Sequence, residues 1–108
     1  MITGVTTSEI KKEIRCIITA GQRNVLAVFG FGSHFRGESY RDIDILVVLK
    51  PKCGPLLPTY YSLKRALEEL SEHLGVAIDL TVLTWEEFAD RPLRDMDSLV
   101  EIVAPADQ

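Results

Sequence analysis

The sequence has no excess of basic residues and no long apolar run, and each shortage excludes a class of protein. The chain has 12 lysines and arginines and 16 aspartates and glutamates, which gives a net charge of −4. Binding to nucleic-acid phosphates depends on basic groups that displace counterions, so the composition argues against nucleic acid as the main ligand. The longest apolar run, Ile43 to Leu49 with Asp44 inside it, is far shorter than the roughly 18 residues of a membrane-spanning helix.

Cysteine is also scarce. Cys16 and Cys53 lie far apart and form no CxxC motif, so neither a structural zinc site nor a disulfide framework is indicated. The N-terminal residues show no charged leader followed by an apolar stretch, so no signal peptide is expected. These features predict a cytoplasmic protein with reduced thiols and no membrane association.

What is present suits one small globular unit. With 108 residues, 46% of them hydrophobic, the chain is expected to form a single domain over residues 1–108. Apolar spacing and turn residues predict a first helix, capped by Thr6 or Ser8 and ended by Gly21, followed by strands over 24–29 and 42–49. A connection is predicted over 51–58 and a second helix over 59–74, ended by Gly75. A third strand over 76–83 and a short helix over 84–89 follow. This order indicates an α/β (α+β) fold, with a small mixed sheet flanked by helices. Residues 93–103 are compatible with a helix or, in part, a strand.

A turn rich in glycine follows the first predicted strand. In the sequence GFGSHFRG, Gly32 allows the backbone to approach a ligand, and Ser33 can begin a helix whose free N–H groups attract phosphate oxygens. Arg36 follows one turn later and could bind the same anion with paired donors. The alternative is an ordinary strand-to-helix turn with a serine cap and a surface arginine.

Two carboxylates begin the second predicted strand. Residues two apart on a strand face the same way, so Asp42 and Asp44 should project together. Their mutual repulsion would be relieved by a divalent cation, and hard oxygen ligands suit Mg²⁺ or Mn²⁺. The alternative places Asp42 in solvent before the strand and pairs Asp44 with Arg41 or a lysine.

A third acid, Asp79, lies within the apolar strand over 76–83, where aspartate is disfavoured and costly to bury. If this strand lies beside the strand over 42–49, Asp79 can converge with Asp42 and Asp44. Three converging acids cannot all stay ionised cheaply, so at least one should have a raised pKa when no cation is bound.

Together, GSxxRG, DID and the lone Asp79 resemble the DNA polymerase β-like nucleotidyltransferase superfamily, and most closely its minimal (MNT-type, antitoxin-like) members in bacteria and archaea. The resemblance covers residues from about 24 to 90. It implies a nucleotidyltransferase fold and two bound divalent ions, Mg²⁺ or Mn²⁺. The nucleotide- and phosphate-binding residues that it implies are Gly32, Ser33 and Arg36. The catalytic and metal-binding residues that it implies are Asp42, Asp44 and Asp79.

The same resemblance implies a metal-dependent enzyme that transfers a nucleoside monophosphate, AMP from ATP or another NTP, to a hydroxyl. The segment after Asp79 is too short for a separate domain that grips the base or the acceptor. Another polypeptide or another copy of the chain should therefore help to hold them. Small family members often work beside a helical HEPN-domain protein, which makes such a protein the leading partner and this chain the antitoxin of a toxin–antitoxin pair.

One departure from the family pattern supports a different reading. Only ESYR separates Gly37 from Asp42, a shorter stretch than in many relatives. The alternative is therefore a catalytically weak binding module of the same fold that neutralises its partner by contact alone. An antibiotic-modifying transferase fits the chemistry, but the chain has little length left for an acceptor pocket.

Overall fold

The computed structural model describes residues 6–21, 24–31, 42–51, 56–90 and 99–103. Its elements are α1 (Thr7–Gly21), β1 (Val25–Phe31), β2 (Asp42–Leu49), α2 (Leu56–Leu74), β3 (Ala77–Thr84), α3 (Trp85–Ala89) and β4 (Val100–Val103). None of the helices in the described ranges is both long enough and apolar enough to cross a membrane.

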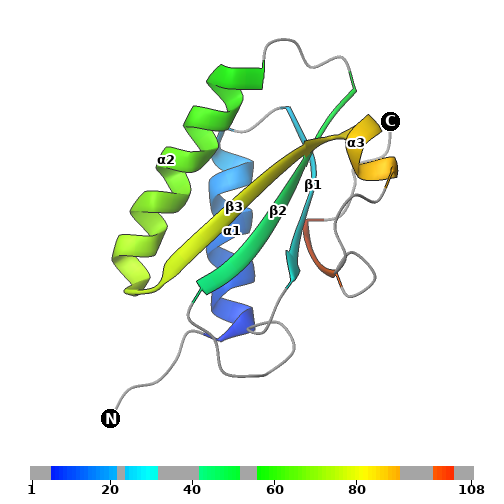
Figure 1. The fold of residues 1–108 in the computed structure, drawn as a ribbon. Coiled ribbons are helices and arrows are strands. Elements are labelled where there is room, and N and C mark those ends of the chain that lie inside the picture. The colour runs from blue at the N-terminus through cyan, green and yellow to red at the C-terminus, as the bar shows by residue number, and fades with distance from the viewer. Residues whose placement is uncertain (1–5, 22–23, 32–41, 52–55, 91–98, 104–108) are drawn as a thin grey trace.

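The strands form one mixed sheet in the order β3-β2-β1-β4 (Figure 1). β1 is antiparallel to both β2 and β4, whereas β2 and β3 are parallel. Parallel neighbours need a crossover connection, and α2 provides it by returning the chain from the end of β2 to the start of β3. The predicted mixed sheet flanked by helices is confirmed.

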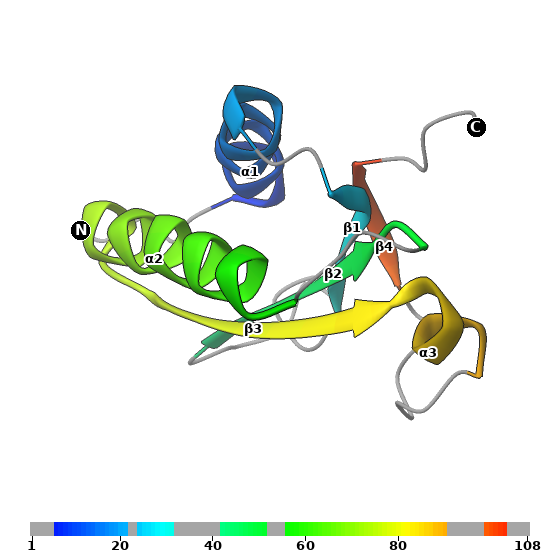
Figure 2. The ribbon, with the colours of Figure 1, turned by 90° about the horizontal axis from the view of Figure 1, so that it is seen from above.

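The two faces of the sheet are covered differently. α1 and α2 pack on one face, which we call the helix face (Figure 2). Its buried core consists of Ile10, Ile14, Val25, Val28, Ile43, Ile45, Val47, Leu49, Leu63, Leu67, Leu70 and Ile102. On the second face, which we call the open face, α3 packs through Phe88, whose ring stacks on Phe29 with centroids 5.4 Å apart. Within the described ranges, α3 is the one helix on this face, and it covers one end of it.

Capping explains where α1 and α3 begin. The Thr6 hydroxyl accepts the Glu9 N–H at 3.1 Å, and the Glu9 carboxylate accepts the Thr6 N–H at 3.2 Å. Thr84 and Glu87 repeat this reciprocal pair at the start of α3, at 3.1 and 2.9 Å. The predicted cap at Thr6 and the predicted start of the short helix at Thr84 are confirmed, and each capping box supplies acceptors to helix N–H groups that have no partner within the helix.

The start of α2 differs from the prediction. Residues 51–58 were expected to be a connection because of their prolines, yet α2 begins at Leu56. Pro58 lies in the first turn of the helix, where the missing N–H would have no partner within the helix anyway. The prediction treated this proline as a helix breaker, whereas its position in the first turn makes it compatible with the helix.

The end of α2 and the strand β4 were also predicted, the first as a glycine stop and the second as one of two alternatives. Gly75 has φ = 71°, and the N–H groups of Gly75 and Val76 both donate to the Ser71 carbonyl, at 2.9 and 3.3 Å. The predicted glycine stop is thus confirmed. At the other edge of the sheet, residues 100–103 form a strand, and the Arg15 side chain donates to the Ile102 carbonyl at 2.8 Å. The strand alternative for the tail is confirmed there, while residues 93–98 lie outside the described ranges.

Replacing Gly75 with alanine should lower the free energy of unfolding by about 1 kcal/mol, because a side chain disfavours positive φ. A Cβ atom at this position would meet no other atom within 4 Å, so the loss should come from the backbone conformation alone. Gly75→Asn should cost less, since asparagine tolerates this conformation better. Urea unfolding of the three proteins checks the order, and an unchanged Gly75→Ala variant would contradict it.

Candidate active site

Asp42 and Asp44 lie at the start of β2 on the open face. Ile43 and Ile45, which alternate with them, are fully buried on the helix face. Because successive strand residues point to opposite faces, the two carboxylates project together from the other side, as the sequence predicted. Asp42 is exposed and Asp44 is partly buried.

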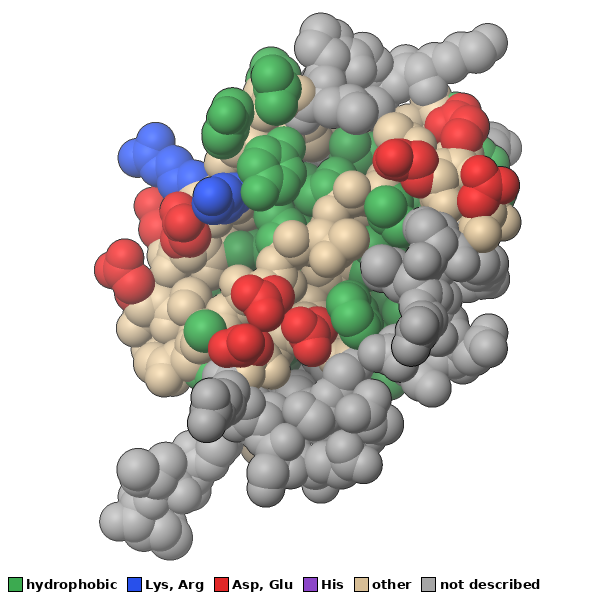
Figure 3. Space-filling view, in the orientation of Figure 1, with side chains coloured by type: hydrophobic (Ala, Val, Ile, Leu, Met, Phe, Trp, Pro, Cys, Tyr) green, Lys and Arg blue, Asp and Glu red, His purple; other side chains and the backbone are tan. Residues whose placement is uncertain are grey.

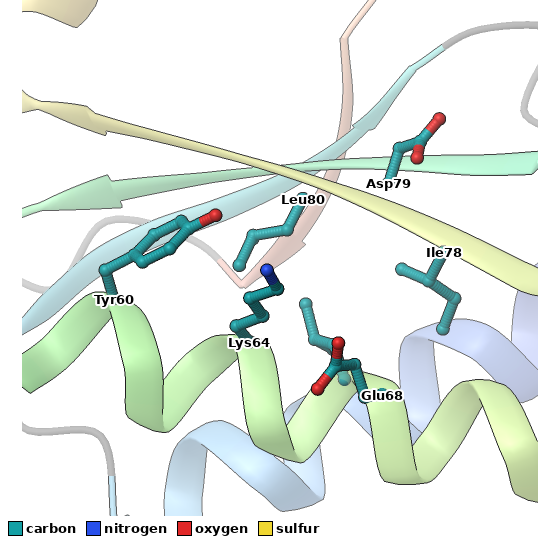
Figure 4. A pocket seen from close by; sticks show the side chains of 7 residues that line it. Tyr60, Lys64, Glu68, Ile78, Asp79 and Leu80 are labelled. Atoms are coloured by element: carbon teal, nitrogen blue, oxygen red, sulfur yellow. The ribbon is translucent and has the colours of Figure 1, made fainter.

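Asp79, the third residue of β3, lies directly beside Asp44. The parallel register pairs the two residues, so their side chains share the open face. In Figure 4 the Asp79 carboxylate points away from α2, and the side chains of Ile78 and Leu80 point toward it. The expected pairing of the two strands is confirmed. The expected burial of Asp79 is wrong, because β3 is an edge strand and leaves this side chain exposed.

The carboxyl groups of Asp79 and Asp42 are close enough to form a side-chain hydrogen bond. Partial desolvation raises the pKa of Asp79, and the nearby negative charge of Asp42 and this hydrogen bond raise it further. The predicted raised pKa among the three acids is therefore confirmed for Asp79. Figure 3 shows acidic side chains close together below the middle of the face turned to the viewer, with other acidic side chains at its left and right.

The donor atoms at this end of the sheet suit a hard divalent cation in their chemistry. Asp42, Asp44 and Asp79 offer carboxylate oxygens, which Mg²⁺ and Mn²⁺ prefer, and a cation would offset the negative charge that raises the pKa of Asp79. Within the described ranges, however, no three His, Cys, Asp or Glu side chains are already gathered closely enough to hold a metal ion. The three residues fit a cation by the type of their donor atoms and by their shared face of the sheet.

The predicted phosphate-binding residues Gly32, Ser33 and Arg36 lie outside the described residues. The strands on either side nevertheless fix where that segment is attached. Phe31, the last residue of β1, is the register partner of Asp44, and the chain re-enters the sheet at Asp42. Both ends of the segment are thus anchored beside the acidic residues.

A hollow between α2 and β3 was not indicated by the sequence analysis. It has a volume of about 220 Å³ and is lined by Tyr60, Lys64, Leu67, Glu68, Ile78, Asp79 and Leu80. The spacing of Tyr60, Lys64 and Glu68, four residues apart along α2, places them on one helix face, and this spacing could have revealed the cluster. Since the Asp79 carboxylate points to the other face, the hollow lies across β3 from the acidic residues (Figure 4).

Comparisons with known proteins identify the family of this chain and proteins of similar fold. Residues 9–104 match a family model described as a nucleotidyltransferase domain. None of the curated proteins matches the chain. A candidate nucleotidyltransferase from Sulfolobus solfataricus is 27% identical, with a TM-score of 0.56, and the match covers 85% of this chain and 74% of that one.

Two solved toxin–antitoxin complexes contain chains of similar fold. One, solved with AMP-PNP, matches with a TM-score of 0.60 at 16% identity, over 87% of this chain and 73% of that one. The other, a mutant of the MntA-HpeT complex, gives a TM-score of 0.51 at 19% identity, over 67% of this chain and 55% of that one. At these identities the likeness concerns the fold. The family match, in contrast, runs from α1 through β4 and includes all three acidic residues, so the chain belongs to the nucleotidyltransferase domain family.

Proposed function

We propose that this chain transfers a nucleoside monophosphate, AMP from ATP, to a hydroxyl group and releases pyrophosphate. The observation that carries the proposal is the register of β2 and β3, which puts Asp44 beside Asp79 on the open face, with Asp42 in contact with Asp79. Membership of the nucleotidyltransferase family supports the reaction class. The exposure of Asp42 and Asp79 leaves the site accessible to a nucleotide.

The three aspartates are proposed as the catalytic carboxylates and as ligands of two divalent ions, Mg²⁺ or Mn²⁺. When bound, such ions would neutralise the negative charge of the triphosphate and of the attacking oxygen. The chain itself orients the nucleotide and stabilises charge, because transfer of this kind asks little covalent chemistry of the protein. Gly32, Ser33 and Arg36 are proposed to bind the phosphates, which is supported by the attachment of their segment next to Asp44.

The proposed acceptor is a hydroxyl on a helical HEPN-domain protein, which this chain would inhibit as an antitoxin. Support comes from the two toxin–antitoxin complexes that contain a similar fold, one of them solved with the ATP analogue AMP-PNP. The exposed carboxylates of Asp42 and Asp79 on the open face are compatible with the approach of a large acceptor.

The second candidate function is a binding module that neutralises its partner by contact alone. The short ESYR stretch between Gly37 and Asp42 favours it, because a short connection restricts how a phosphate-binding turn can be placed relative to the acids. A module of this kind would inhibit its partner equally well after Asp44→Asn, whereas the transferase would not.

Nucleotide binding should depend on Asp44. Isothermal titration of the full chain with ATP and Mg²⁺ should show binding, and Asp44→Asn should weaken it at least tenfold, since a charged ligand group is lost. Asp90→Asn, in an exposed aspartate at the end of α3, is the matched control and should bind like the wild type. Absence of binding by the wild type, or equal binding by Asp44→Asn, would refute the site.

Magnesium should stabilise the fold through the same residues. At a hundredfold excess over Kd, a ligand that binds only the folded state adds about 2.7 kcal/mol to the free energy of unfolding. Asp42→Asn removes a negative charge beside Asp79, so the metal-free variant should be at least as stable as the wild type, yet it should gain less from Mg²⁺. Thermal melting in EDTA and in excess Mg²⁺ measures both effects. An equal loss of stability in the two conditions would mean that Asp42 is structural.

The raised pKa of Asp79 sets a direction for the pH dependence of stability. The pKa of Asp79 is 3.8 in the unfolded chain and higher in the folded chain. At pH values between these two, the folded chain binds more protons than the unfolded chain. The free energy of unfolding in EDTA should therefore fall as pH rises through this interval. Asp79→Asn should reduce that fall, and Asp90→Asn should not. Urea unfolding over a pH series checks this, and identical slopes for wild type and Asp79→Asn would contradict it.

A further inference from the structure

Large exposed apolar side chains gather at the start of α2. Within the described ranges, Leu57 and Tyr61 are the most exposed large hydrophobic residues, at 64% and 61%. They lie four residues apart, so they are neighbours on one face of the helix. Tyr60 packs edge-on against Tyr61, with ring centroids 5.7 Å apart. Neighbouring apolar side chains on a surface are typical of sites that contact another molecule.

The hollow between α2 and β3 continues this apolar surface. It is lined by Tyr60 and by the apolar side chains of Leu67, Ile78 and Leu80. In Figure 4, Tyr60 and Lys64 both extend from α2 toward β3. The volume of about 220 Å³ is below the roughly 300 Å³ at which small-molecule pockets begin, so the hollow fits a side chain of another protein better than a free ligand. We call the exposed residues at the start of α2, Lys64 and this hollow together the α2 surface.

A cation without a described partner borders the hollow. Lys64 is exposed, and among the described residues it forms no ion pair. The neighbouring Arg65, in contrast, pairs with Glu69 at 3.8 Å. Glu68 borders the hollow one turn further along α2. A protein that fits the α2 surface should therefore carry a carboxylate at the Tyr60 end of the hollow, away from Glu68, next to apolar side chains.

The α2 surface lies close to the acidic site. Asp79 lines the hollow while its carboxylate points to the open face, so the width of β3 separates the two. Figure 3 shows hydrophobic side chains over the start of α2, above the acidic side chains of the same view. From Asp79 to Thr84, at the end of β3, the strand spans about 17 Å. An interface of standard size, about 800 Å² on each partner, is wide enough to cover this distance.

We propose that the α2 surface docks the protein that carries the acceptor hydroxyl. The docked element is a helix of that protein whose exposed face combines apolar side chains with a carboxylate. This inference rests on the proposed function, in which the acceptor belongs to a helical protein. An apolar side chain of the partner fills the hollow, and the carboxylate pairs with Lys64. Contacts of this kind, remote from the reacting atoms, hold the hydroxyl in position near the acids.

Two substitutions on the α2 surface test the docking site. The probe is a purified HEPN-domain protein, titrated calorimetrically into the full chain. Tyr61→Asp places a charge in the apolar contact, and Lys64→Glu repels the carboxylate of the partner, so each should weaken binding about tenfold. Both variants should bind ATP and Mg²⁺ like the wild type, since neither residue belongs to the acidic site. Both should also melt near the wild-type temperature, because the two side chains are exposed.

Cys16→Asp is the matched control. It places the same charge at an exposed position of α1, which lies away from β3 (Figure 2), and it should leave binding of the HEPN-domain protein unchanged. In hydrogen exchange, the bound protein should increase the protection of amides in α2 and β3, and amides of α1 should exchange as before.

The docking site and the proposed function can fail separately. Binding that neither Tyr61→Asp nor Lys64→Glu weakens would overturn the docking site, even where AMP transfer still occurs. Weakened binding by both variants supports the docking site, even where the wild type transfers no AMP and the proposed function fails. A wild-type chain that does not bind the HEPN-domain protein would overturn the docking site. So would self-association of the chain that Tyr61→Asp abolishes, because a second copy would then cover the α2 surface.

Discussion

The candidate site depends on the parallel pairing of β2 with β3. The two acidic segments are far apart in the sequence, and only this pairing brings Asp44 next to Asp79. Parallel strands need a long crossover, which α2 provides, with Leu63, Leu67 and Leu70 buried against the sheet. A shift of one residue in the register would turn Asp79 toward α2 and Ile78 toward solvent. Hydrophobic burial on the helix face therefore fixes the acids on the open face.

The same arrangement explains why the acids can be tolerated. The side chains on β2 change along the open face from Asp42 and Asp44 to the buried Leu46 and Val48, which lie under α3. Carboxylates occupy the end that no described helix covers, where water or a cation can solvate them, and apolar side chains occupy the end under α3. The contact of Phe88 with Phe29 and the capping box at Thr84 fix which end of this face α3 covers.

Most of the fold could be predicted because its local signals agree with its packing. The capping boxes at Thr6 and Thr84 and the glycine stop at Gly75 each act within a few residues, so the sequence carries the whole signal. The start of α2 was placed too late because proline has opposite effects in the first turn and in the interior of a helix. The strand over 100–103 could not be decided from its residues, since it depends on pairing with β1 and on Arg15 of α1.

The acidic residues of the site could be predicted from the sequence, whereas the exposure of Asp79 and the neighbouring hollow could not. Alternation along β2 placed Asp42 and Asp44 on one face, and an aspartate within an apolar strand marked Asp79. The exposure of Asp79 depends on β3 being the outermost strand, and strand order is a tertiary property that no local pattern encodes. The hollow beside Lys64 and Glu68 arises from the distance between α2 and β3, which is likewise a matter of packing.

In the proposed function, the acidic residues at the start of β2 and β3 support the transfer of AMP from ATP to a partner protein. This transfer is tested by the intact mass of the proposed HEPN-domain partner after incubation with this chain, ATP and Mg²⁺. We expect the partner to gain the mass of an AMP group with the wild-type chain and not to gain it with Asp44→Asn. A partner that is neutralised at unchanged mass, or modified equally by both chains, would contradict it.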